Sequence, residues 1–385
     1  MDFKQSRRDK GKQMSTLATN AITDASGGNT ATINGQTPTV SNMAGRNRLI
    51  NSDMRIDQRN AGASVTNDSA DLKFAVDRTN IYGAVSSKFT AQQNAGSVTP
   101  PAGFSNYLGC TSSSAYTVGA NENFWVQQRI EGYNVADLDW GTANAKTVTL
   151  SFWVRSSLTG TFGGSFQNSA SNRSYPFTYT INTANTWEQK TVTVVGDTSG
   201  TWLTTNGVGI KVTWGLGIGS TYSGTAGAWA GANYNAPTGA VSVVGTSGAT
   251  FYITGVQLEA GSVATPFERR QYGQELALCQ RYYEWGAASG SGYAAITAIF
   301  DAGSTSNIDF KVSKRVVPTM TNMTLSGNQY PNNQSNSVPR YEGGYSRGFR
   351  YTTEHNTTFW NVTTGAGGSG GPAGHQIIWN ANAEL

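Results

Sequence analysis

The stretch Thr147-Val-Thr-Leu-Ser-Phe-Trp-Val-Arg155 decides the fold class, because apolar and polar side chains alternate along it. A period of two residues is that of a half-buried β-strand. Trp153 interrupts the polar side of the pattern. We expect the apolar members to face a core and the polar members to face outward, the inward set being Val148, Leu150, Phe152 and Val154 and the outward set Thr147, Thr149, Ser151 and Arg155.

Similar stretches recur along the chain and are separated by turns rich in Gly, Ser and Asn. They predict strands at 48–56, 124–130, 186–194, 209–214 and 249–259, with a bulge at Gly255 in the last. In 124–130 one face carries Phe124, Val126 and Ile130. No helix of convincing length is expected between residues 46 and 262, which excludes a βαβ fold. The pattern predicts a β-sandwich, whose core is expected to include the strand tryptophans Trp153, Trp187 and Trp214.

Composition supports an all-β protein. The 385 residues include 46 Gly, 37% are hydrophobic, 11% are aromatic and only 13% are charged. This chain is too apolar to be disordered, has no collagen-like glycine period, and lacks the Glu, Lys and Leu that fill exposed helices. Its two cysteines, Cys110 and Cys279, exclude a disulfide framework, and its two histidines, His355 and His375, argue against a zinc site or a catalytic triad.

The single helical stretch lies at 267–285. Tyr272, Leu276, Cys279 and Tyr283 fall on one helical face, after Pro266 and before a glycine. A smaller β region follows, with strands expected near 294–300, 307–312, 348–352, 358–362 and 376–379, a long loop at 328–345 and a Gly-rich loop at 365–374. The domain organisation predicted from this is an extended arm at 1–45, a sandwich at 46–266, a helical connector at 267–285 and a C-terminal β domain at 286–385.

The positive charge lies at the start of the chain. The net charge is +4, and the basic residues of the arm are Lys4, Arg7, Arg8, Lys10 and Lys12. Such an arm can anchor the chain to an acidic partner surface, or it can be a solvated tail. Nucleic acid is not expected as a partner, because aromatic side chains do not alternate with the basic ones.

Targeting signals are not expected. The first ten residues contain no apolar stretch typical of a secretory signal peptide, and no apolar run is long enough to span a membrane. The sequence therefore predicts synthesis in a cytoplasm and no membrane insertion.

Aromatic residues in Gly-, Thr- and Ala-rich loops form the candidate binding site. Exposed aromatic faces stack on sugar rings, and nearby amides and hydroxyls complete the hydrogen bonds. An equally open alternative is that these residues fill an interface between chains. The candidate glycan-binding residues are Trp140, Trp202, Tyr222, Trp229 and Tyr234.

Two further patterns give weaker indications of a functional site. Asp137 and Asp139 are spaced as calcium ligands or as a carboxylate pair of a glycoside hydrolase, but the same spacing is common in turns. The segment 215–219 is rich in glycine without a following helix, so a turn fits it better than a phosphate cradle. We expect no catalytic residue, no metal and no cofactor, and therefore no enzyme.

Several motifs resemble those of a known family. Asn47-Arg-Leu-Ile-Asn-Ser-Asp-Met-Arg-Ile-Asp-Gln-Arg59 resembles the opening motif of bacteriophage tail-fibre and other virion-surface fibre proteins, with Ser52 and Met54 replacing the usual Gly and Phe. The remaining matches follow in order over roughly 46–285, namely Gln127–Gly132, Leu150–Ser157, Gly255–Glu259, Ala264–Glu268 and Cys279–Tyr283. The same region is also similar to jelly-roll carbohydrate-binding modules.

The resemblance implies a jelly-roll β-sandwich on a phage particle and identifies no catalytic residue. It implies a homotrimeric tail fibre, attached to other virion proteins through residues 1–45 and binding a glycan or receptor on the host surface. A fibre on the capsid, a glycan depolymerase and a secreted sugar-binding module remain the alternatives.

Overall fold

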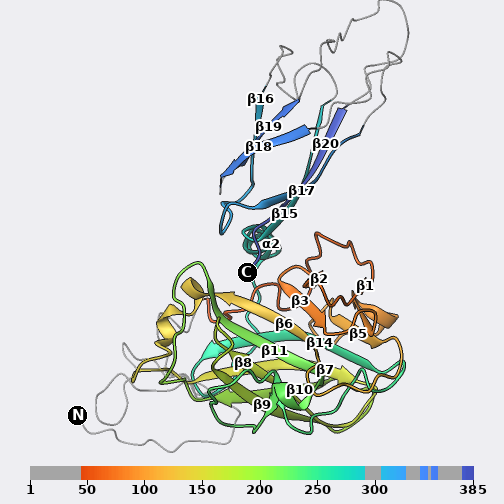
Figure 1. Ribbon diagram of the computed structural model, residues 1–385, viewed down its shortest axis with the longest axis vertical. Helices are drawn as coiled ribbons and strands as arrows, with labels where there is room; N and C mark the ends of the chain where they lie inside the picture. Colours follow the sequence, from red (N-terminus) through yellow and green to blue (C-terminus); the bar gives the residue numbers. More distant parts are fainter. Residues whose placement is uncertain (1–44, 291–304, 327–338, 346–347, 354–374) are drawn as a thin grey trace, which may run out of the picture. The chain divides into compact units, whose positions relative to one another are not determined.

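The computed structural model describes residues 45–290, 305–326, 339–345, 348–353 and 375–385. This part of the chain is an all-β jelly-roll sandwich of two large sheets, with smaller sheets towards the C-terminus (Figure 1). The arm residues Lys4, Arg7, Arg8, Lys10 and Lys12 lie outside the described residues, so the anchoring role stays a prediction. None of the described helices is both long and apolar enough to cross a bilayer.

Each sandwich sheet has six strands, and every pairing in both is antiparallel. The first sheet runs β1 (Val65–Thr66), β4 (Phe89–Gln93), β5 (Leu108–Ser112), β14 (Thr250–Ala260), β7 (Val148–Ser156) and β10 (Glu188–Val194). The second sheet runs β2 (Lys73–Val76), β3 (Thr79–Gly83), β6 (Asn123–Glu131), β11 (Val208–Ile218), β8 (Gly160–Gln167) and β9 (Ser174–Ile181).

Short elements join these strands. A two-residue parallel pair is formed by β12 (Ser223–Gly224) and β13 (Ala236–Pro237). The single-turn 3₁₀ helices are η1 (Ala95–Ser97), η2 (Gly132–Asn134), η3 (Ala136–Leu138) and η4 (Ser220–Tyr222).

The alternating stretch behaves as a strand of the core. Its four predicted inward residues are 0% exposed in β7, and the expected strands at 124–130, 186–194, 209–214 and 249–259 are all present. The prediction that Thr149 and Ser151 face solvent is wrong, because the chain beyond β14 covers them. Thr149 donates from Oγ1 to the Gly261 carbonyl at 2.8 Å, and Gln257, opposite Ser151, donates to Thr265.

Two other core predictions have different outcomes. The bulge at Gly255 is confirmed, since the β14–β7 register shifts between Thr254 and Gln257 and Gly255 has φ +59°. Trp214 is 2% exposed and belongs to the core, whereas Trp153 and Trp187 are half-buried at the surface of the first sheet.

The predicted strand at 48–56 is wrong. Asn51 and Met54 have positive φ angles of 54° and 58°, which break an extended chain. The side chain of Asn51 instead bonds the backbone of Ile56 and Asp77. Side chains, and not a neighbouring strand, provide hydrogen-bond partners for the backbone of this segment. The Ile50 amide, for example, donates to the side-chain oxygen of Gln128. The segment can therefore be buried without belonging to a sheet.

The helix is shorter than the predicted stretch. α2 (Tyr272–Gln280) buries Cys279, but Tyr272 is 56% exposed, so the expected apolar face is wrong at its first position. Tyr282, two residues after the helix, is fully buried and packs with Ile50, Ile56 and Cys279. The bend after Gln280 therefore places Tyr282, and not Tyr272, in this cluster.

The C-terminal region forms two three-stranded antiparallel sheets. One has β15 (Tyr283–Gly290), β20 (His375–Asn382) and β17 (Thr319–Ser326), and the other has β16 (Thr305–Asp309), β19 (Gly348–Thr353) and β18 (Pro339–Tyr345). Strands expected near 307–312, 348–352 and 376–379 are present, while the expected loop at 328–345 contains β18. The predictions at 294–300, 358–362 and 365–374 lie outside the described residues, and the domain boundaries stay predictions.

Candidate functional site

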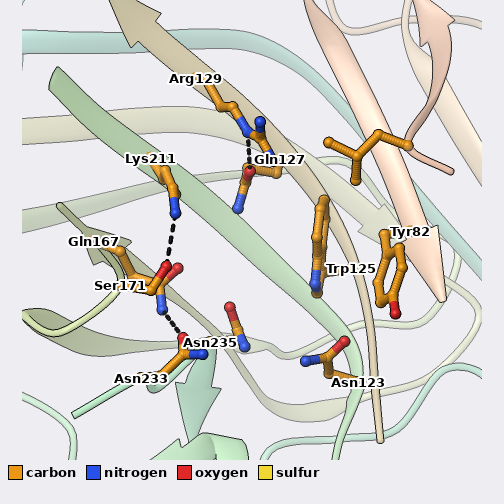
Figure 2. A pocket seen from close by; sticks show the side chains of 11 residues that line it. Tyr82, Asn123, Trp125, Gln127, Arg129, Gln167, Ser171, Lys211, Asn233 and Asn235 are labelled. Carbon is orange, nitrogen blue, oxygen red and sulfur yellow. Dashed lines mark hydrogen bonds between the residues drawn. The ribbon is translucent and has the colours of Figure 1, made fainter. Parts of the chain in front are cut away.

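A pocket of about 250 Å³ lies on the outer face of the second sheet (Figure 2). Its floor is formed by outward side chains of the neighbouring strands β3, β6, β11 and β8, and loop residues complete its wall. The lining residues are Leu72, Tyr82, Asn123, Trp125, Gln127, Arg129, Gln167, Ser171, Lys211, Asn233 and Asn235.

Strand alternation places these side chains together. On β6, Phe124 and Val126 face the core, so Trp125, Gln127 and Arg129 face outward. The register pairs Tyr82 with Trp125, and Arg129 with Lys211. Lys211 is in turn opposite Gln167 on β8. The pocket floor is thus a patch of cross-strand neighbours held by ladder hydrogen bonds.

One end of the pocket is aromatic. The rings of Tyr82 and Trp125 stack with centroids 5.3 Å apart and planes 29° from parallel. Trp125 is 7% exposed and Tyr82 is half-buried. Figure 2 shows the indole nitrogen of Trp125 at the end of the ring nearer Asn123.

One polar atom beside these rings lacks a partner. The Oδ1 atom of Asn123 is buried and accepts no hydrogen bond from the described part of the chain. Asn235, which is 5% exposed, also lines the pocket. Because buried polar groups are normally paired, the Asn123 oxygen fits a ligand that donates from a hydroxyl.

The amides at the other end are held in place. Gln127 accepts from Arg129 Nε at 2.9 Å and donates to Thr213 Oγ1 at 2.9 Å. Gln167 donates to the Asn233 side chain at 2.8 Å and to a loop carbonyl at 3.0 Å (Figure 2). These contacts fix both amide groups before any ligand arrives.

Two cations give this end a positive potential. Lys211 donates from Nζ to the Ser169 carbonyl at 3.0 Å and to Ser171 Oγ at 2.7 Å. Burial, and then the nearby Arg129 charge, lower the pKa of Lys211 to about 8. Burial also lowers the pKa of Arg129. Both side chains therefore carry charge at neutral pH in a partly desolvated place.

The predicted glycan-binding residues lie elsewhere. Trp140, Trp202 and Trp229 form an edge-to-face cluster with centroid distances of 4.8, 5.3 and 5.4 Å. The expectation of exposed faces is wrong for Trp140 and Trp202, which are 7% and 9% exposed. They are buried because their rings pack together and their indoles donate to the carbonyls of Lys146 and Ser199.

The other three predicted residues are half-buried. Trp229 belongs to the tryptophan cluster and donates to the Val195 carbonyl at 2.7 Å, while Tyr222 lies in η4. Tyr234 comes closest to the pocket, because its carbonyl accepts from Gln167. None of the five side chains lines the pocket, and their glycan role stays a prediction.

Asp137 and Asp139 are each ion-paired. Asp137 contacts Arg48 at 2.7 Å, and Asp139 contacts Lys146 at 3.3 Å. Within the described ranges, no group of three or more His, Cys, Asp or Glu side chains is arranged to hold a metal ion.

A second hollow, of about 540 Å³, is lined by residues of 57–61 together with Tyr283, Trp285 and Asn380. The Arg59 side chain in this hollow already has partners within the protein. Its guanidinium lies 3.6 Å from the Tyr283 ring centroid and donates a hydrogen bond to Glu384 at 2.8 Å. Arg59 Nε and Asn380 Oδ1 are buried there without a hydrogen-bond partner in the described part of the chain. The first pocket differs in having the stacked rings of Tyr82 and Trp125 beside its partnerless atom.

Strand alternation in the sequence indicates the pocket, whereas the aromatic residues in loops do not. The face of 124–130 opposite to its apolar side carries Trp125, Gln127 and Arg129, and the same alternation puts Lys211 and Thr213 outward on 209–214. Tyr82 had no such signal, because no strand was predicted around it.

Comparisons with known proteins place the chain near several solved β-structures. No family model and no curated protein matches the sequence. A sugar-binding protein described as putative from Bacteroides thetaiotaomicron is 13% identical over 56% of this chain and 100% of its own, with a TM-score of 0.34. A family 11 carbohydrate-binding module from Clostridium thermocellum is 9% identical over 52% of this chain and 98% of its own, with a TM-score of 0.25.

A third solved structure is the enzymatically active domain of tailspike protein 4 from bacteriophage CBA120. It is 11% identical over 48% of this chain, with a TM-score of 0.28, and the match spans only 20% of the tailspike chain. With TM-scores of 0.34 or below, these likenesses carry no inference about what this chain binds.

Proposed function

We propose that the outer face of the second sheet binds a glycan. The observation that carries this proposal is the buried Oδ1 atom of Asn123, which has no partner in the described part of the chain and lies beside the Tyr82–Trp125 stack. A sugar has hydroxyls all round its ring and an apolar face of C–H groups. It can therefore donate a hydrogen bond to Asn123 while its apolar face packs against the aromatic rings.

Preorganisation supports the same role. Gln127 and Gln167 are held by protein hydrogen bonds, and the strands that carry them, β6 and β8, are each paired with a strand on both sides. A ligand that binds here pays little to order the protein, so a few contacts can give measurable affinity.

A glycan array probed with the purified full chain tests this proposal. We expect Asn123→Ala and Tyr82→Ala to weaken binding to the glycans that the natural chain retains. Tyr133→Ala is the matched control, since Tyr133 is 62% exposed and does not line the pocket. Equal binding by all four proteins would place the glycan elsewhere, and no binding by any would contradict the proposal.

We further propose that the chain is a virion structural protein, a phage tail fibre that uses this face to attach to the host surface. The motif resemblance over roughly 46–285 supports this role, with residues 1–45 as the attachment to the particle. A head-attached decoration fibre is the alternative. Cross-linking of Lys4, Lys10 and Lys12 in intact particles distinguishes the two, because the partners would be tail proteins in one case and capsid proteins in the other.

Oligomeric state and catalysis complete the proposal. A homotrimer turns weak sugar contacts into avid attachment, and the mass of the full chain in solution tests it. We also propose that the chain is not an enzyme. Long incubation with a bound polysaccharide should release no new reducing ends, whereas release would favour a depolymerase.

A further inference from the structure

Two cations face each other in the pocket floor. Lys211 on β11 and Arg129 on β6 are direct cross-strand partners, and both side chains line the pocket. Like charges directly opposite each other destabilise a sheet. The arrangement therefore lowers the stability of the free protein. Folding does not explain why the two cations lie opposite each other, whereas ligand binding would.

The side chains that contact this pair are neutral. Arg129 donates from Nε to Gln127 and from Nη1 to the main-chain oxygen of Leu385, at 2.9 and 2.8 Å. Lys211 donates to Ser169 and Ser171. Across the described ranges, neither cation forms an ion pair with a side-chain carboxylate.

Other buried or partly buried cations of this chain do have such partners. Lys314 contacts Glu284 at 2.5 Å, and Arg173 and Arg281 contact Asp197 and Glu131, each at 2.6 Å. Charges that are partly buried are normally paired, because removing an unpaired charge from water costs free energy. The pocket is thus a place where, within the described ranges, the fold gives the positive charge no side-chain counter-charge.

The charge lies within reach of the sugar surface described above. Figure 2 shows Lys211 and Arg129 at one end of the lining residues and Trp125 with Tyr82 at the other. The amide of Gln127 lies between the two ends and is held by Arg129. An oligosaccharide with one ring at the aromatic end can therefore place an acidic substituent of another ring at the cations, since Trp125 and Arg129 are four residues, or about 13 Å, apart along β6.

We infer that the pocket takes an anionic sugar, whose carboxylate or sulfate is bound by Lys211 and Arg129. This inference rests on the proposed glycan-binding function and names the class of glycan. An anionic group supplies the missing counter-charge and accepts charge-assisted hydrogen bonds, which are stronger than those between neutral groups. A neutral sugar would leave the two cations opposed.

Matched ligands test the inference on the natural chain. The probes are an oligogalacturonide and the same oligosaccharide after reduction of its carboxyl groups, and a sulfated and a desulfated galactan, all titrated by calorimetry. We expect at least one acidic form to bind about 10- to 100-fold more tightly than its neutral form, since hydrogen bonds to charged groups have that strength. The uronic and sulfated arms separate the two sources of negative charge.

Variants test the residue assignment. Lys211→Met should remove most of the preference for the acidic form, and Lys211→Arg should retain it. Lys146→Met removes the same charge at a site that is half exposed and outside the pocket, and it should change nothing. Lys211→Met should also unfold at a higher temperature than the natural chain, because it removes a destabilising charge.

The outcomes separate the two proposals. Equal affinity for acidic and neutral forms, with binding still sensitive to Asn123→Ala, would overturn the anionic inference and leave the glycan site standing. An acidic preference that survives Lys211→Met would overturn the assignment to this pair. Failure of every acidic and neutral glycan on the array would overturn both proposals. The paired ligands on the natural chain decide the question even if a variant does not fold.

Discussion

Arg281 donates two hydrogen bonds to the carboxylate of Glu131, from Nη2 at 2.6 Å and from Nε at 2.9 Å. The Tyr282 hydroxyl donates a third at 2.6 Å. Glu131 ends β6, the strand that carries Trp125, and is 1% exposed. These three hydrogen bonds hold the segment after α2 against β6, one of the strands of the pocket floor.

Glu131→Gln should destabilise the sandwich by on the order of 3 kcal/mol, because it leaves the Arg281 cation without its counter-charge in a partly buried place. Urea unfolding measures the change. Asp137→Asn is the control, since Asp137 and Arg48 form a surface ion pair, and it should cost less than about 1 kcal/mol. Equal losses in the two variants would contradict a special role for Glu131.

The same carboxylate should make stability depend on acid pH. Burial alone raises the pKa of Glu131, but the hydrogen bonds from Arg281 and Tyr282 lower it overall below its ordinary value of 4.5. A lowered pKa gives stability that is present above pH 4.5 and is lost as the pH falls further. We expect the denaturation temperature of the natural chain to fall more steeply below pH 4.5 than that of Glu131→Gln.

Gly255→Ala should destabilise the fold by roughly 1–3 kcal/mol, as overpacking of a core does. A Cβ at Gly255 would lie 2.5 Å from the Phe104 ring, and its φ of +59° disfavours any other residue. Gly273→Ala in α2 is the matched control, because a Cβ there meets nothing within 4 Å. It should stabilise by up to about 1 kcal/mol. Thermal melts of the pair should move in opposite directions.

Trp202→Ala separates a core role from a glycan role for the tryptophan cluster. Trp202 packs edge-to-face on Trp140 and Trp229, so its truncation should cost about 3–5 kcal/mol. Where the variant remains folded, its affinity for glycans on the array should be unchanged. Lost affinity with unchanged stability would support the role that the sequence predicted for this residue.

Affinity for an acidic sugar should fall as the pH rises through about 8. Burial and the Arg129 charge lower the pKa of Lys211 to about 8, so its ammonium group loses its proton in this range. Arg129 remains charged and retains part of the affinity. Calorimetric titrations between pH 6.5 and 9.5 measure the decline, which Lys211→Arg should abolish. An unchanged decline in that variant would assign the titration to another group.

The sequence predicts the sandwich well, because strand alternation is a local signal. Residues 147–155 and 124–130 carry it in full, and both strands are present. The segment 48–56 also alternates, but positive φ angles at Asn51 and Met54 depend on side-chain partners such as Gln128 that are distant in sequence. Local alternation cannot reveal those partners.

The candidate site was harder to predict, since it depends on register. Lys211 and Arg129 lie 82 positions apart in sequence and become neighbours only when β11 pairs with β6. Trp140 and Trp202 were expected to be exposed because glycine-rich loops surround them, yet a loop aromatic is buried wherever other rings can cover it. Composition alone does not distinguish these outcomes.

A crystal structure of the full chain with the oligosaccharide that it binds most tightly tests the central claim most directly. We expect a sugar ring beside Trp125 and Tyr82, hydrogen-bonded to Asn123 or Asn235, and an acidic substituent at Lys211. Density for the sugar against Trp229, Tyr222 and Tyr234, or in the hollow lined by Tyr283 and Trp285, would contradict it.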